Sequence, residues 1–104
     1  MLQVIRDWYR DNYWRLHQAG LEVSHNLPFG KESGYVDFVR KDRFGDLRRA
    51  GRLIVWDRET VMCDSQAYDG VTSEDIFYRH YEIANEDELR LRLEELAEAI
   101  LAGD

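Results

Sequence analysis

The side chains best suited to chemistry in this sequence are three histidines and one cysteine. His17, His25 and His80 lie too far apart for the three- or four-residue spacing with which a helix presents two metal ligands. Cys63 has no cysteine or histidine neighbour along the chain. The sequence therefore predicts no metal site.

A catalytic set is equally hard to assemble. Met62 and Asp64 flank Cys63 and supply no positive charge that would activate a thiol, so we interpret Cys63 as inert and half-buried. His80 could act as a general base, but a partly buried structural histidine is the commoner role for such a residue. The glycines are scattered among expected turns and form no phosphate-binding loop. We expect neither enzymatic activity nor a cofactor.

Charge is distributed unevenly along the chain. The formal net charge is -7, and the 14 Lys and Arg residues are concentrated before Glu59, whereas most of the 21 Asp and Glu residues follow it. An acidic field of this kind repels nucleic acid and anionic membranes and attracts a basic partner. The alternative is a solvated acidic surface that only keeps the protein soluble.

Two locally basic stretches, residues 40–43 and 48–52, raise the question of RNA binding, with Phe44 and Trp56 as stacking surfaces. The excess of acidic residues weakens any attraction for phosphate. We expect these arginines to pair with the acidic half of the same chain, without direct contact with nucleic acid.

Length and composition predict one compact domain covering residues 1–104. Hydrophobic residues make up 44% of the chain, which is ordinary for a globular protein and too high for a disordered one. Charged residues begin at Arg6, too early for a signal peptide, and no apolar run approaches the roughly 20 residues of a membrane-spanning helix. A single cysteine rules out an internal disulfide and fits a reducing compartment, so we expect a cytoplasmic protein that does not bind membranes.

The elements that must position these side chains can be predicted from hydrophobic periodicity. Residues 2–19 have apolar positions at steps of three and four, which indicates an amphipathic helix that ends at Gly20. Asn85 and Glu88 form a capping-box pattern ahead of a second helix, which Gly103 should end. Between the helices, strands are predicted at residues 21–27, 35–39, 53–56, 60–68 and 76–83.

This order predicts an α+β fold: an N-terminal helix, an antiparallel meander sheet of four to five strands and a C-terminal helix. We expect both helices on one face of the sheet, because each has a single apolar stripe to bury.

Several motifs carry a resemblance to a known family. They are GRLIVWD at residues 51–57, Met-Cys-Asp at residues 62–64 and IFYRHY at residues 76–81, preceded by a Trp-containing helix and followed by a leucine-rich one. With these motifs the chain resembles the immunity proteins of bacterial polymorphic-toxin and contact-dependent inhibition systems, and within them the family named TriTu. The resemblance covers most of the chain but not residues 28–34 and 40–50.

The resemblance implies a cytoplasmic antidote that binds and neutralises the C-terminal domain of a cognate toxin. It further implies a tRNA-cleaving nuclease as the toxin, with elongation factor Tu reached only through that toxin. A nuclease needs a basic groove for phosphate, so its inhibitor gains by presenting carboxylates. We therefore expect toxin contacts from carboxylates and tyrosines in the acidic half of the chain: Asp64, Tyr68, Asp69, Glu74, Asp75 and Tyr78.

The main alternative is an acidic secretion chaperone that holds a segment of an effector protein. Such a chaperone would dimerise and present apolar grooves to an extended peptide, whereas an immunity protein meets a folded domain. Each acidic candidate also has a purely structural interpretation, because Asp69 can make a turn and Glu74 or Asp75 can simply face solvent.

Overall fold

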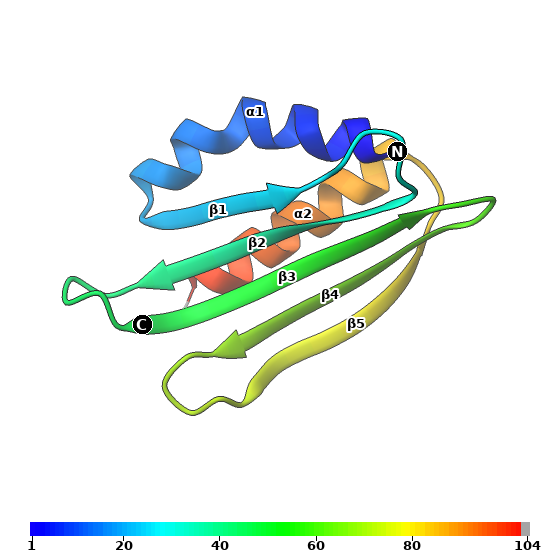
Figure 1. The fold of residues 1–104 in the computed structure, drawn as a ribbon. Coiled ribbons are helices and arrows are strands. Elements are labelled where there is room, and N and C mark those ends of the chain that lie inside the picture. The colour runs from blue at the N-terminus through cyan, green and yellow to red at the C-terminus, as the bar shows by residue number, and fades with distance from the viewer. Residues whose placement is uncertain (103–104) are drawn as a thin grey trace.

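A computed structural model describes residues 1–102 and confirms the predicted α+β architecture (Figure 1). Five strands form one antiparallel meander, in which each strand pairs with the next one along the chain in the order β1-β2-β3-β4-β5. A helix precedes and another follows the sheet. The elements are α1 (Leu2–Gln18), β1 (Leu21–Asn26), β2 (Ser33–Lys41), β3 (Leu47–Asp57), β4 (Val61–Asp69), β5 (Asp75–Ile83) and α2 (Glu86–Leu101).

Both helices pack against one face of the sheet, which we call the covered face (Figure 1). Alternate strand positions supply its apolar side chains, since successive residues of a strand point to opposite faces. The register aligns Val23, Phe38, Gly51, Ala67 and Phe77 across the five strands. Leucines of α2 and the apolar stripe of α1 complete one continuous core with this face.

Gly51 lets α2 lie close to the centre of the sheet. A Cβ atom added to this glycine would lie 2.8 Å from the backbone oxygen of Gln66 and 2.8 Å from Cδ1 of Leu96. Glycine is therefore required here by the close approach of α2 and of the β4 backbone, and not by its backbone conformation.

The two ends of α2 are stabilised in different ways. The side chain of Asn85 accepts a hydrogen bond from the Glu88 backbone N–H at 2.9 Å, as the capping-box pattern predicts. At the other end the last turn of the helix has no basic residue of its own. Arginines of the sheet replace it: Arg49 donates to the carbonyl of Ala99 at 2.6 Å, and Arg40 to that of Leu101 at 3.5 Å. The predicted stop at Gly103 lies outside the described residues.

The arginine-rich segments behave differently from the sequence-based expectation. They lengthen β2 and β3 well beyond the predicted 35–39 and 53–56, and a turn at residues 42–46 joins them. The expected pairing with the acidic half of the chain is wrong for Arg52, whose guanidinium binds both carboxylate oxygens of Asp37 at 2.6 and 2.9 Å. Arg40 and Arg49 instead bind helix carbonyls, because they lie under the C-terminus of α2.

Substitution of Gly51 by alanine tests how closely α2 approaches the sheet. The new methyl group would collide with a backbone oxygen that cannot move without disturbing β4, so we expect Gly51→Ala to lower the free energy of unfolding by about 1–3 kcal/mol. Urea denaturation followed by circular dichroism measures the change. In a Leu96→Ala background the same substitution should cost less than in the wild type, but the cost should not vanish, because the collision with Gln66 remains. An unchanged midpoint in the single variant would contradict the close approach.

Candidate functional site

Within residues 1–102, no helix or strand covers the face of the sheet opposite the helices, and we call it the open face. Two rows of side chains cross all five strands on it. One row joins Ser24, Asp37, Arg52, Gln66 and Tyr78, and the next joins Asn26, Tyr35, Ile54, Asp64 and His80. All of these side chains are half-buried or exposed. The open face is therefore a broad surface in which aromatic, aliphatic and charged groups alternate.

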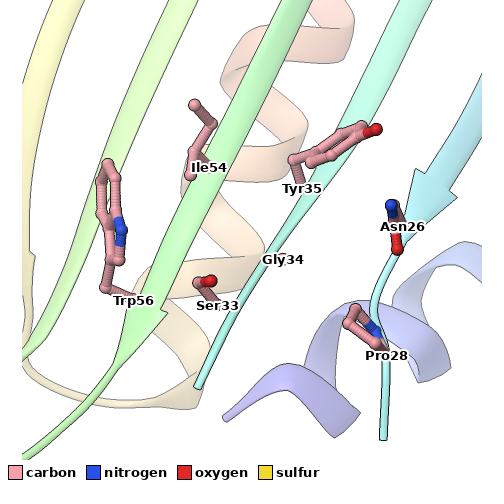
Figure 2. A pocket seen from close by; sticks show the side chains of 7 residues that line it. All are labelled: Asn26, Pro28, Ser33, Gly34, Tyr35, Ile54 and Trp56. Atoms are coloured by element: carbon pink, nitrogen blue, oxygen red, sulfur yellow. The ribbon is translucent and has the colours of Figure 1, made fainter. Parts of the chain in front are cut away.

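Two shallow hollows lie on the open face. The first is apolar at its centre, where Tyr35 of β2 lies beside Ile54 and Trp56 of β3 (Figure 2). The second lies over the middle of the sheet between Asp37 and Tyr68. Arg52 connects them, because its guanidinium lines the second hollow and lies 4.1 Å from the ring centre of Tyr35 in the first.

A hydrogen-bonded cluster of Asp64, Tyr78 and His80 occupies the β4–β5 side of the open face. The Tyr78 hydroxyl donates to Oδ2 of Asp64 at 2.7 Å, and Nδ1 of His80 contacts Oδ1. Burial acts to raise the pKa of Asp64, but the hydrogen bonds from His80 and Tyr78 outweigh it and lower that pKa. The hydrogen bond to Asp64 in turn raises the pKa of the Tyr78 hydroxyl. The cluster therefore holds one fixed negative charge and presents two exposed rings.

Four of the predicted contact residues share this part of the open face. Asp64, Tyr68 and Tyr78 belong to β4 and β5, and Asp75 joins them by accepting a hydrogen bond from the Gln66 amide at 2.9 Å.

The two other predicted residues lie in or beside the turn between β4 and β5. The Asp69 carboxylate accepts backbone hydrogen bonds from Val71 at 2.8 Å and Thr72 at 3.0 Å, so it makes the turn. These hydrogen bonds lower the pKa of Asp69. The Glu74 side chain is exposed next to β5. The structure thus separates residues that the sequence treats as one acidic stretch.

The apolar centre of the open face was missed by sequence reasoning. Residues 53–56 form a continuous apolar run, which was interpreted only as a central strand. In the structure Leu53 and Val55 point into the core, whereas Ile54 and Trp56 are half-buried on the open face. The predicted topology could have revealed this apolar surface, because two helices on one face leave the side chains on the other face of the sheet exposed.

The degree of burial expected for two single residues is wrong. Cys63 is fully buried on the covered face, where desolvation, followed by the charge of Asp64, raises the pKa of its thiol to about 12. His80 is not a partly buried structural histidine, because 53% of its side chain is exposed.

The pair of Asp64 and His80 has the form in which a carboxylate orients a catalytic imidazole. The cysteine next to Asp64 cannot serve as its nucleophile, since it faces the opposite side of the sheet as an un-ionised thiol. Within residues 1–102, no group of three or more metal-binding side chains converges. Nor does any helix in that range have the length and apolar character to cross a membrane.

Comparison with known proteins gives one match. The model of a family described as immunity protein TriTu matches residues 3–99, which is nearly the whole chain. Neither a curated protein nor a solved structure matches the sequence.

The Asp64 cluster makes a prediction about pH. Because the pKa of Asp64 is lowered in the folded state, its contribution to stability is present above the pKa of about 4 in the unfolded chain and is lost as the pH falls. We expect Asp64→Asn to lower the free energy of unfolding near pH 7 by about 1 kcal/mol, and the difference from the wild type to shrink below about pH 4.

Urea denaturation across this pH range measures the effect. Glu82→Gln is the matched control, because it removes a negative charge from an exposed position of β5 whose side chain has no hydrogen-bond partner within residues 1–102. A similar pH profile for both variants would count against a specific role of the cluster.

Proposed function

Because the chain belongs to the TriTu family of immunity proteins, we propose that it binds a cognate toxin domain and neutralises it through the open face. The observation that supports this assignment of the surface is the set of half-buried aromatic residues, Tyr35, Trp56 and Tyr68, on a sheet face with no covering element. Tyrosine, tryptophan and arginine dominate the energetics of protein interfaces. Arg52 adds the third of these residue types between the two hollows.

The shape of the open face favours a folded partner over an extended peptide. Its two hollows are open to solvent, and the aromatic groups are divided between them, with Tyr35 and Trp56 in the first and Tyr68 in the second. This favours an immunity protein over the acidic secretion chaperone, which needs a groove for the segment that it holds. We accordingly propose a role as an inhibitor rather than as an enzyme, acting in the cytoplasm as one domain.

The charges that border this face favour a basic toxin. On the β1–β3 side, acidic groups are already paired, since Asp37 binds Arg52 and Glu22 lies 3.6 Å from Lys41. On the β4–β5 side, Glu74 and Glu82 are exposed carboxylates. A domain with lysines and arginines would therefore be oriented toward β4 and β5. Of the predicted contacts, we propose that Asp64, Tyr68, Glu74, Asp75 and Tyr78 lie in the interface and that Asp69 only shapes the turn.

A domain that binds the phosphates of nucleic acid needs a basic groove, so a nuclease fits the basic partner, and we propose a nuclease as the toxin. The family resemblance adds tRNA as the substrate of that nuclease. Elongation factor Tu would then join the complex by binding the toxin, with no surface of its own on this chain.

Co-expression with the toxin domain encoded beside this protein tests the proposed function. We expect the chain to restore growth of cells that produce the toxin and to purify with it as a stable complex. The matched variant is Trp56→Ala, which removes an aromatic group from the open face; it should weaken the complex at least about tenfold while circular dichroism shows a folded chain. Continued growth arrest in the presence of a well-folded wild-type chain would contradict the proposal.

The orientation of the partner makes a kinetic prediction. Reversal of Glu74 and Glu82 to lysine should slow association about tenfold at low salt and flatten its dependence on ionic strength, because attraction of a basic partner depends on nearby carboxylates. Stopped-flow mixing or surface plasmon resonance at several salt concentrations measures the rate constant.

The control carries the same change in net charge at a distance from this edge. Asp11→Lys with Glu98→Lys alters one exposed carboxylate on α1, which packs on β1 at the opposite edge of the sheet, and one on α2. Equal slowing in both double variants would show that only net charge matters and would contradict the proposed orientation.

A further inference from the structure

Strand β5 forms one edge of the sheet and is the least buried of the long strands. It lies along the border of the sheet in Figure 1, and within residues 1–102 its only strand neighbour is β4. Most of its residues are exposed, although Ile76, Phe77, Tyr78 and Tyr81 are residues typical of buried or paired strands. Such an edge presents backbone N–H and C=O groups that have no partner strand.

The residues whose backbone groups point outward can be identified from the hydrogen-bond pattern. In an antiparallel sheet, both backbone groups of one residue point to the same neighbouring strand, and successive residues alternate. The Asp57 N–H donates to the carbonyl of Glu32 at 2.6 Å, on the β2 side. Ile54 and Trp56 are an odd number of residues away from Asp57. Their backbone N–H and C=O groups therefore point to β4.

The alternation continues across β4 into β5. Ile54 is opposite Asp64, so the backbone of Asp64 points back to β3 and that of Ser65 points to β5, where it meets Arg79. The hydrogen bond from the Gly70 N–H to the Arg48 carbonyl at 2.9 Å agrees, since Gly70 directly follows β4 and is an even number of residues from Asp64. The outward N–H and C=O groups are therefore those of Tyr78, His80 and Glu82.

This edge has few of the features that prevent pairing with another strand. Natural edges are often short or contain proline or lysine, but β5 is nine residues long and has neither. The irregularity in its pairing is confined to the end near Ala67 and Tyr68. Arg79 is the charged residue of β5 on the side of the covered face. Its guanidinium lies 4.5 Å from the ring centre of Phe77. The segment from Tyr78 to Glu82 is thus free to accept a strand.

We propose that the toxin domain adds one extended strand to β5 along residues 78–82, a mode of binding that rests on the proposed function and specifies its geometry. Charge supports a basic strand as the occupant, because Asp64, Glu74 and Glu82 lie beside this edge. A second copy of this chain is a poorer fit, since it would bring the same carboxylates together and carries the same net charge of -7. The side chains of Tyr78 and His80 lie on the open face, so the added strand continues the proposed docking surface.

Amide hydrogen exchange followed by nuclear magnetic resonance tests the proposal. In the free chain, the amides of Arg79 and Tyr81 should exchange slowly and those of Tyr78, His80 and Glu82 rapidly. Binding of the toxin domain should slow the exchange of the amides of Tyr78, His80 and Glu82 on the order of a hundredfold. The outward N–H of each of these residues gains a carbonyl partner on the added strand.

Three results would overturn it in distinguishable ways. A tight complex in which those three amides still exchange rapidly overturns strand addition but not toxin binding. Failure of the toxin domain to bind at all overturns the proposed function and the strand with it. Slow exchange of the three amides in the free chain at high concentration identifies a second copy as the occupant.

A pair of variants at position 80 distinguishes the contribution of the backbone N–H to toxin binding from that of the side chain. His80→Pro removes the outward N–H, whereas His80→Ala keeps it, and proline is tolerated at an edge where the N–H faces solvent. We expect the proline variant to bind the toxin on the order of tenfold more weakly than the alanine variant.

His25 of β1 provides the matched control, because the same alternation points its N–H outward at the opposite edge of the sheet. We expect His25→Pro and His25→Ala to bind the toxin with equal affinity. Equal binding of the two His80 variants, with unchanged melting temperatures, would overturn the role of the edge.

Discussion

One-sided coverage of the sheet is the constraint on which the rest of the structure depends. The alternate side chains that point toward α1 and α2 form a single core, and Gly51 allows α2 to lie across the middle of the sheet. Within residues 1–102 the two helices lie on one side of the sheet, and no other helix or strand lies on the opposite side. Half of the side chains of the central strands are consequently left at the surface, including Ile54 and Trp56, which a covering helix would bury in a larger protein.

The electrostatic asymmetry of the chain has a structural explanation as well. The acidic second half is not simply a solvated surface, since part of its charge lies in α2 next to Arg90 and Arg92, which pair with Glu86, Asp87, Glu88 and Glu95. The basic first half supplies Arg40 and Arg49 to the C-terminus of the same helix. The carboxylates of Glu74 and Glu82, at the β4–β5 border, remain exposed. The acidic excess of the second half of the chain is thus partly paired within α2, and Glu74 and Glu82 are among the carboxylates that stay exposed.

Hydrophobic periodicity was sufficient to predict the order and type of every helix and strand, because each has an apolar stripe or alternation of its own. Periodicity was insufficient for the length of β2 and β3. Arg40 and Arg49 extend these strands because they bind carbonyls at the C-terminus of α2, a contact that periodicity does not reveal.

Register also lay beyond the sequence. Asp64 and His80 meet because the turn after Asp69 sets the pairing of β4 with β5, and a shift of one residue would send His80 to the other face. For the same reason, the sequence indicated acidic and aromatic residues as contacts but did not show which of them lie on the open face and which make the turn.

An exposed edge beside an exposed apolar face is a hazard for a soluble protein, because both promote association with the wrong partner. The features that reduce the hazard here are electrostatic rather than steric. The carboxylates near β5 repel a second copy of the chain and anionic polymers, whereas they attract a basic domain. On the proposed function, the same groups would disfavour self-association and favour the basic partner, while the open face stays exposed within residues 1–102.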